Sequence, residues 1–344
     1  MIYIYKYWKI DRIKSYDRLF NFVIGGRGIG KTYACKREGI KQYLASGEQF
    51  IYLRRYKEEI KPLKNGKFFE TISNEYPDYE FRTTGELLQL RPGVPEGEKN
   101  ENKWETCGYL INLSTALTKK SVDYANVSMI IYDEFIIPKG FIRYLPNEVE
   151  SFLDFYETVA RTRNNVKVYF LSNAISAYNP YFIYFKLQAP KEGGFYKTKE
   201  IVVEMCANKE FAEQKKQSRF GQIIEGTKYA AYAIDNEFYL DDAKFIAKKP
   251  GTARYFCTII YKSASIGIWV DYKEGKWYAC KNVDKSCKLS YALTTSDHDI
   301  NTLYTAITKP AQLKAVAKAY ALGVLFFESQ EVKGYMGEIM ELIK

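Results

Sequence analysis

Residues 25–32 read Gly-Gly-Arg-Gly-Ile-Gly-Lys-Thr and match the phosphate-binding loop pattern G-x-x-x-x-G-K-[ST] at every fixed position. The preceding residues, Leu-Phe-Asn-Phe-Val-Ile at 19–24, predict a strand that enters the loop, and residues 33–46 predict a helix that leaves it. Glycines let such a loop turn its N–H groups toward phosphate oxygens, and the dipole at the helix N-terminus favours the same anion. The stretch therefore predicts a nucleoside triphosphate site.

The residues of this loop have distinct expected roles. Lys31 is expected to reach the β- and γ-phosphates, and the Thr32 hydroxyl is expected to hold Mg²⁺. The other expected ATP contacts come from the loop residues Gly25, Gly26, Arg27, Gly28, Ile29 and Gly30. The alternative, a glycine-rich turn without a ligand, is disfavoured by the strand and helix on either side.

Composition narrows the class of protein. The chain has 344 residues, of which 47% are hydrophobic, so a disordered chain and a small disulfide scaffold are both disfavoured. Its 51 Lys and Arg exceed its 41 Asp and Glu, for a formal charge of +10. That excess favours a polyanionic partner, most simply nucleic acid, although an acidic membrane surface or plain solubility would also fit.

The cysteines and the single histidine argue against several kinds of site. The six cysteines form no C-x-x-C pair, and only His298 offers an imidazole, so neither a zinc site nor a histidine-based triad is expected. Scattered cysteines in a chain without a recognisable signal peptide suggest a reducing cytoplasm. No run approaches the roughly 18 apolar residues of a membrane span.

The chain divides into parts of different character. Strand-like and helix-like segments alternate up to residue 190, as in a parallel α/β fold, with strands expected at 49–53, 128–132 and 166–171 and a helix at 147–163. Residues 92–103 predict an exposed hairpin loop. We predict an ATPase domain over 1–197, a helical linker over 198–227 and a mixed C-terminal domain over 228–344. The last is expected to hold strands at 255–261 and 267–272, a hairpin turn at 273–276, and helices at 310–322 and 330–343.

Asp133 and Glu134 directly follow the apolar run at 128–132. An acid at the carboxyl end of a buried strand lies near the exit of the phosphate-loop strand, where Asp133 can order the Mg²⁺ shell and Glu134 can polarise the attacking water. The pair therefore predicts the Walker B arrangement of an ATPase, against the alternative of an acidic pair that opens a loop. The Asn-Lys-x-Asp motif expected of a GTPase is absent from the sequence.

Three further residues are candidates for the site. Asn173 ends the strand at 166–171 and is expected to act as a sensor near the γ-phosphate, unless it only terminates the strand. Arg161 and Arg163 close the predicted helix at 147–163, where a cation also complements the helix dipole. The pattern alone does not identify either arginine as an arginine finger.

These segments resemble the DNA-packaging ATPases of phi-29-type tailed bacteriophages. Beyond the loop and Asp133-Glu134-Phe135, the similarity is carried by several short strings: Ser15-Tyr16-Asp17-Arg18, Asn21-Phe22-Val23-Ile24, Gly47-Glu48-Gln49-Phe50-Ile51-Tyr52, Arg54-Arg55-Tyr56-Lys57, Pro146-Asn147-Glu148-Val149, Leu171-Ser172-Asn173-Ala174, Asn179-Pro180-Tyr181-Phe182 and Ser218-Arg219-Phe220-Gly221. The resemblance runs through the ATPase half and weakens after Asp235-Asn236.

The resemblance implies a fold and a function. The fold is a RecA-like ASCE ATPase domain, a short helical linker, and a smaller α+β domain that resembles a degenerate RNase H-like nuclease without activity. The function is Mg²⁺-dependent ATP hydrolysis by a homopentameric ring on the prohead portal, in the host cytoplasm, which drives double-stranded DNA into the capsid. Some members also dock on a packaging RNA. No membrane partner is implied.

The resemblance also assigns roles to individual residues. Arg161 corresponds to an arginine finger that acts in trans, Lys57 to a residue in a lid over the nucleotide, and Lys120 to a lysine that acts in trans. Asp235 stands where a nuclease acid would, without a convincing set of partner carboxylates. Two alternative functions remain open: a helicase or other DNA-remodelling ATPase of the same fold, and a nucleotide-gated scaffold without turnover.

Overall fold

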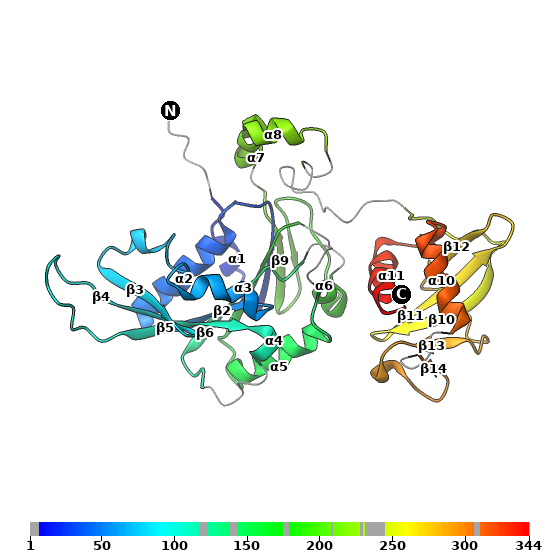
Figure 1. Ribbon diagram of the computed structural model, residues 1–344, viewed down its shortest axis with the longest axis horizontal. Helices are drawn as coiled ribbons and strands as arrows, with labels where there is room; N and C mark the ends of the chain where they lie inside the picture. Colours follow the sequence, from blue (N-terminus) through cyan, green and yellow to red (C-terminus); the bar gives the residue numbers. More distant parts are fainter. Residues whose placement is uncertain are drawn as a thin grey trace. The chain divides into compact units, whose positions relative to one another are not determined.

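The computed structural model describes residues 7–116, 123–137, 143–174, 179–207, 209–227, 230, 245–305 and 310–343. The chain divides into two compact units, Met1–Leu240 and Asp241–Lys344 (Figure 1).

The first unit is built on a nine-stranded sheet in the order β3-β4-β5-β2-β6-β7-β1-β9-β8. Its strands are β1 (Phe20–Ile24), β2 (Gln49–Arg54), β3 (Tyr79–Thr84), β4 (Leu87–Pro92), β5 (Glu105–Asn112), β6 (Val127–Asp133), β7 (Lys167–Ser172), β8 (Phe195–Lys197) and β9 (Ile201–Met205). The six strands from β5 to β9 in this order are parallel, and β4, β3 and β8 join them by antiparallel pairing. The predicted α/β class and the hairpin loop at 92–103, between β4 and β5, are confirmed.

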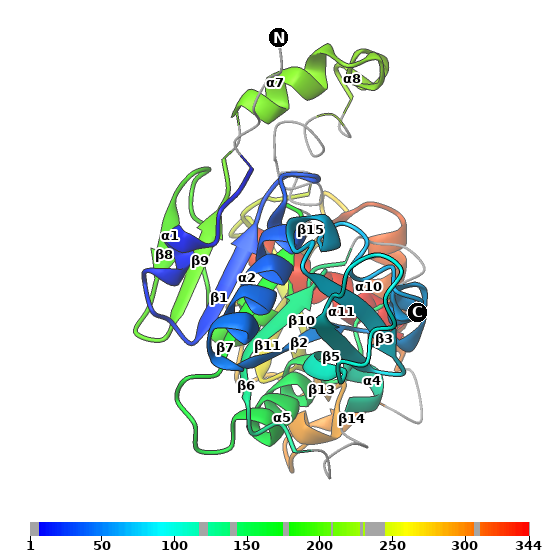
Figure 2. The ribbon, with the colours of Figure 1, turned by 90° about the vertical axis from the view of Figure 1, so that its left-hand side faces the viewer.

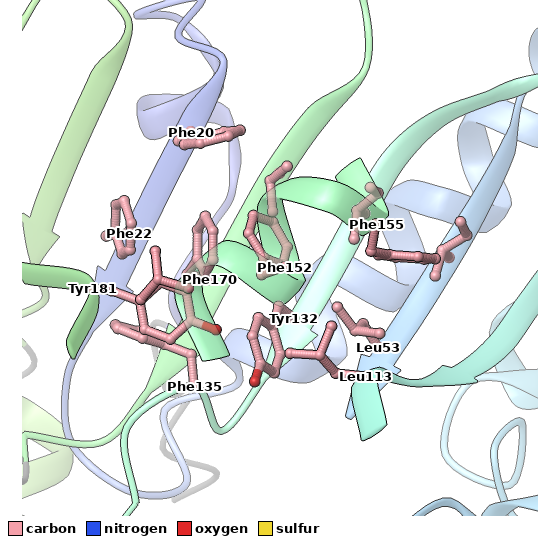
Figure 3. Packing of buried hydrophobic residues seen from close by; sticks show 14 of the residues in the cluster. Phe20, Phe22, Leu53, Leu113, Tyr132, Phe135, Phe152, Phe155, Phe170 and Tyr181 are labelled. Carbon is pink, nitrogen blue, oxygen red and sulfur yellow. The ribbon is translucent and has the colours of Figure 1, made fainter. Parts of the chain in front are cut away.

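Helices cover both faces of this sheet. The buried cluster on one face includes residues of α1 (Asp11–Lys14) and α2 (Lys31–Ser46), and the cluster on the other includes residues of α4 (Leu113–Ala116), α5 (Glu148–Ala160) and α6 (Pro180–Phe185). Successive residues of β1 alternate between them, so Phe22 joins the second cluster and Val23 the first. The Phe22 and Phe170 rings stack with centroids 4.2 Å apart (Figure 3). Because both faces are buried, the central strands are continuous apolar runs.

The remaining elements of the first unit are short. They are α3 (Lys57–Ile60), 3-10 turns at Lys61–Lys64 and Ser73–Glu75, α7 (Lys209–Gln217) and α8 (Arg219–Ile224). The last two helices lie beyond the end of β9 (Figures 1 and 2).

The second unit has a six-stranded mixed sheet in the order β14-β13-β10-β11-β12-β15. Its elements are β10 (Arg254–Tyr261), β11 (Ala264–Asp271), β12 (Lys276–Cys280), β13 (Ser290–Ala292), a 3-10 turn (Thr295–Asp297), β14 (Leu303–Tyr304), α10 (Ala311–Ala321), β15 (Leu325–Phe327) and α11 (Gln330–Ile343). Both helices contribute to the buried cluster of this sheet. The predicted strands, hairpin turn and closing helices are confirmed.

The prediction of a helical linker over 198–227 is wrong at residues 201–205. These residues, Ile-Val-Val-Glu-Met, form β9, which pairs in parallel with β1. The β-branched residues at 201–203 favour a strand. The prediction of a helical linker instead followed the dense charge at 208–219, which lies farther along the chain. The described helices of this stretch are α7 and α8 alone. The predicted helix at 147–163 also ends earlier, at Ala160, because Arg161 has a φ angle of 51°.

Candidate active site

The phosphate-binding loop connects the end of β1 to the first turn of α2. Gly28 and Gly30 have φ angles of 90° and 89°, which glycine adopts at little cost. Gly30 is the N-cap of α2, so the unbonded N–H groups of the first helical turn face the loop. A residue from outside the loop also contacts it, since the main-chain N–H of Trp8 donates to the Ile29 carbonyl at 2.9 Å. The loop therefore has the backbone shape that the motif predicts.

Lys31 is buried beneath this loop. Its Nζ donates to the Gly25 and Gly26 carbonyls at 3.0 and 2.8 Å, and lies 3.5 Å from Asn173 Oδ1. Burial lowers the pKa of Lys31 because the charged form loses hydration. Its carbonyl and amide partners leave the ammonium without a closely bonded carboxylate among the described residues. A phosphate oxygen is the kind of anion that would compensate it.

Thr32 and Asp133 meet at the same edge of the sheet. The Thr32 hydroxyl donates to Asp133 Oδ2 at 3.0 Å, and the Tyr52 hydroxyl donates to the same oxygen at 2.6 Å. Asp133 is 8% exposed. A threonine hydroxyl beside a strand-end carboxylate is the oxygen donor set that Mg²⁺ takes in phosphate-loop proteins. These two residues therefore fit a magnesium ion.

Glu134 follows Asp133 and has a left-handed backbone conformation, with a φ angle of 58°. The Glu134 carboxylate is 56% exposed and pairs with Arg54, whose Nη2 lies 2.6 Å from Oε2. Arg54 Nη2 also lies 3.0 Å from Glu59, and Arg54 Nη1 lies 3.8 Å from Asp133. Arg54 thus lies within ion-pair distance of all three carboxylates, a role that was not predicted from the sequence.

Arg55 and Glu148 form a buried ion pair behind Glu134. Arg55 Nε and Nη2 donate to the two Glu148 oxygens at 2.6 and 2.9 Å, and the two residues are 0% and 2% exposed. The same guanidinium donates to the main-chain carbonyls of Glu134 at 3.1 Å and Phe135 at 2.7 Å. The pair therefore fixes the backbone that carries the expected catalytic base.

Asn173 follows the last residue of β7, which pairs with β1. Its side-chain oxygen lies 3.5 Å from Lys31 Nζ, which places it beside the phosphate-binding loop. This contact suits the sensor role expected of Asn173.

Arg161 lies near the amino ends of the parallel strands, whereas the site lies at their carboxyl ends. The chain leaves the site edge after Asp133, runs through α5, and returns to Lys167 at the start of β7. The two ends of β7 are six residues apart, or roughly 20 Å at about 3.3 Å per residue. The Arg161 side chain is 69% exposed and pairs with Asp123 at 3.9 Å. It is therefore too far to serve the site of its own chain.

Arg163 differs from Arg161 in its contacts. Its guanidinium donates to the main-chain carbonyls of Tyr124, Ala125, Val127 and Val159 at 2.6–2.9 Å. Arg163 thus connects the end of α5 to the start of β6, which is a structural role.

Of the other predicted residues, Lys57 begins α3 just after β2, at the site edge, with an exposed side chain. Arg27 is exposed on the loop. Lys120 and Asp235 lie outside the described residues.

The sequence matches one family model over nearly its whole length. Residues 4–342 match the model described as Podovirus DNA encapsidation protein (Gp16). The chain belongs to this family. The resemblance inferred from the short sequence strings is therefore confirmed.

Relatives align with this chain along most of its length. The DNA packaging protein of Bacillus phage B103 is 38% identical over 317 residues, which cover 92% of this chain and 94% of the relative. The DNA packaging protein of Bacillus phage phi29 is 35% identical over 339 residues, or 98% of each chain.

Solved structures have the same fold. A chain of the bacteriophage phi-29 viral genome packaging motor assembly matches this chain with a TM-score of 0.73 and 34% identity, covering 98% of this chain and 99% of that one. The N-terminal domain of the DNA packaging ATPase from bacteriophage phi29 matches with a TM-score of 0.52 and 37% identity, covering 59% and 97%.

Among the residues that the structure describes, two kinds of feature are absent. No helix there is long and apolar enough to cross a bilayer. The same residues contain no group of three or more His, Cys, Asp or Glu side chains placed to hold a metal ion.

Proposed function

We propose that this chain is the ATP-hydrolysing subunit of a viral DNA-packaging motor, which translocates double-stranded genomic DNA into the prohead. The observation that carries the proposal is the meeting of Lys31, Thr32, Asp133 and Glu134 at one sheet edge, in a member of the DNA encapsidation family. The fold supports the RecA-like ASCE assignment, since β7 lies between the loop strand β1 and the acid-bearing strand β6.

In this proposal ATP binds with Mg²⁺, which neutralises charge on the phosphates when bound. Lys31 and the backbone of the loop hold the phosphates, and Thr32 and Asp133 hold the metal. Glu134 accepts the proton of the attacking water, with its main chain fixed by Arg55. Asn173 senses the γ-phosphate through its position beside Lys31. Lys57, exposed at the site edge, forms part of a lid.

The motor is a homo-oligomeric ring, and the position of Arg161 supports this part of the proposal. Arg161 is exposed and lies at the strand ends opposite its own site, so a role for it in ATP hydrolysis would have to be at a neighbour's site. An arginine finger supplied in trans is worth ~10³–10⁵ in rate in related phosphoryl transfers. We propose a pentamer, in line with the family resemblance, with Lys120 as a second residue acting in trans.

The second unit is proposed to be a degenerate RNase H-like domain that contacts DNA or the portal. Its mixed sheet, with the β10–β11–β12 meander extended by parallel pairing on both sides, is compatible with that ancestry. The net positive charge of the chain suits a translocase, which must hold phosphates without reading bases.

The deciding experiment measures ATP hydrolysis with double-stranded DNA, with and without purified proheads. We expect DNA and proheads together to stimulate turnover in the wild type, and Lys31→Ala to have none. Strand displacement without proheads would instead favour a helicase-like ATPase. ATP binding without turnover, even with DNA and proheads, would favour a nucleotide-gated scaffold.

A mixing experiment tests the role of Arg161. Arg161→Ala and Lys31→Ala should each bind into assemblies without hydrolysing ATP. Mixed assemblies should recover some activity, because Lys31→Ala still offers Arg161 to a neighbour with an intact loop. Activity in Arg161→Ala alone, or no recovery in intact mixed assemblies, would exclude the trans role.

A further inference from the structure

One face of α7 lies on the phosphate-binding loop. Phe211 and Lys215 are four residues apart and therefore share a helix face, and both are partly buried. The Phe211 ring is so close to Gly28 that a Cβ there would lie 3.1 Å from its Cζ atom. Lys215 Nζ donates to the Arg27 carbonyl at 3.5 Å. The helix thus touches two consecutive loop residues through an aromatic ring and a cation.

The path of the chain explains how α7 reaches this position. β9 runs parallel to β1, with Met205 opposite Ile24. The main-chain N–H of Cys206 donates to the Ile24 carbonyl at 2.7 Å, so β9 ends where the loop begins. Lys209 starts α7 only four residues after Met205. The covalent connection from the ATPase sheet to the second unit therefore passes over the loop.

The charges around the loop suit an anion. Arg27, Lys31 and Lys215 bring three cations to one short segment. Burial, and then the charge of Arg27, lower the pKa of Lys215, and Lys215 contributes in turn to the lowered pKa of Lys31. Like charges held together are unfavourable unless an anion joins them. A bound polyphosphate would remove that repulsion.

We propose that Lys215 is a further nucleotide-binding residue, which contacts the phosphates of the bound nucleotide and so makes the position of α7 depend on it. This inference rests on the proposed ATP binding. Phe211 keeps the helix against Gly28 while Lys215 turns from the Arg27 carbonyl to a phosphate oxygen. The nucleotide then acts directly on the segment that leads to the second unit.

Calorimetric titration of the full-length chain with Mg·ATPγS tests the proposal. A charge-assisted hydrogen bond contributes about 1.5–3 kcal/mol, so Lys215→Gln should weaken binding about 10- to 100-fold. Lys216→Gln, which removes the same charge from the exposed side of α7, should weaken it less than about threefold. Lys215→Arg should restore most of the affinity.

Hydrogen exchange gives a second readout, which does not depend on measured affinity. Adding ATPγS to the wild type should slow amide exchange in α7, and this slowing should be lost in Lys215→Gln. Equal affinities for Lys215→Gln and Lys216→Gln, or no change in α7 exchange while the wild type binds ATPγS, would overturn this inference and leave the ATPase function intact. A wild type that does not bind ATPγS would overturn both.

Discussion

Replacing Arg55 by Met should destabilise the first unit more than most single substitutions would. The change removes the guanidinium that donates twice to Glu148 and leaves a carboxylate 2% exposed without its cation. The hydroxyls of Tyr132 and Tyr181 still donate to that carboxylate at 2.9 and 3.0 Å, so it remains bound in place. Breaking a buried pair on one side costs about 3–5 kcal/mol.

The same magnitude can be stated as a shift in melting temperature. A domain of 150–250 residues loses about 2–4 °C per kcal/mol, so the transition of the first unit should fall by about 10 °C. Hydrogen exchange should show the loss in β6 and α5, which carry Tyr132 and Glu148. Peptides from β10 and β11 should keep their protection and act as an internal reference.

The double variant Arg55→Met/Glu148→Met provides the control. Since an apolar pair often replaces a buried ion pair at little cost, the double variant should be more stable than the sum of the two single changes predicts. The orphaned tyrosine hydroxyls should keep the recovery incomplete. A loss below about 1 kcal/mol in Arg55→Met, or simple additivity in the double variant, would refute this account of the pair.

Three further outcomes are expected. Glu134→Gln should bind Mg·ATP with near wild-type affinity but lose turnover, because Asp133 keeps the charge beside the metal; a parallel loss of binding in calorimetry would make Glu134 a ligand or structural residue. Tyr52→Phe removes a hydrogen bond to a buried carboxylate and should lower the free energy of unfolding in urea by about 2 kcal/mol; a loss under about 0.5 kcal/mol would contradict the bond. Burial lowers the pKa of Lys36 from 10.5 to about 8, so the unfolded chain holds more protons between these values and stability should rise with pH across them. Lys36→Met should flatten that rise in urea titrations from pH 7.5 to 9.5, and an unchanged slope would contradict it.

The part of the site that follows from local spacing was predictable. A glycine-rich loop that follows a strand, and acids that directly follow a buried strand, both lie at the carboxyl ends of parallel strands. The parallel sheet alone therefore brings them together. Lys31, Thr32, Asp133 and Asn173 therefore meet as expected. The same reasoning applies to Arg54, which ends β2 at that edge, but its partners could not be read from the pattern.

The rest depends on contacts between distant segments. Glu148 lies 93 positions after Arg55 in the chain, and nothing in the sequence around either residue indicates that the two side chains form a buried ion pair. Similarly, β9 forms a strand by pairing with the side of β1 that β7 does not occupy. Because β9 ends beside the loop, α7 can contact it. Such pairings are set by the whole sheet, and composition along the chain could not provide them.

The two outermost strands of the nine-stranded sheet, β8 and β3, have a consequence for assembly. One edge strand, β8, has three residues, and the other, β3, carries charged Glu80 and Arg82 along a half-exposed strand. Short or charged edge strands are poor templates for pairing with another chain. Neighbouring copies should therefore meet through the side chains of helices and loops, without a continuous hydrogen-bonded ladder across the boundary. In the proposed ring, an interface of that kind could slide or rotate without breaking main-chain bonds.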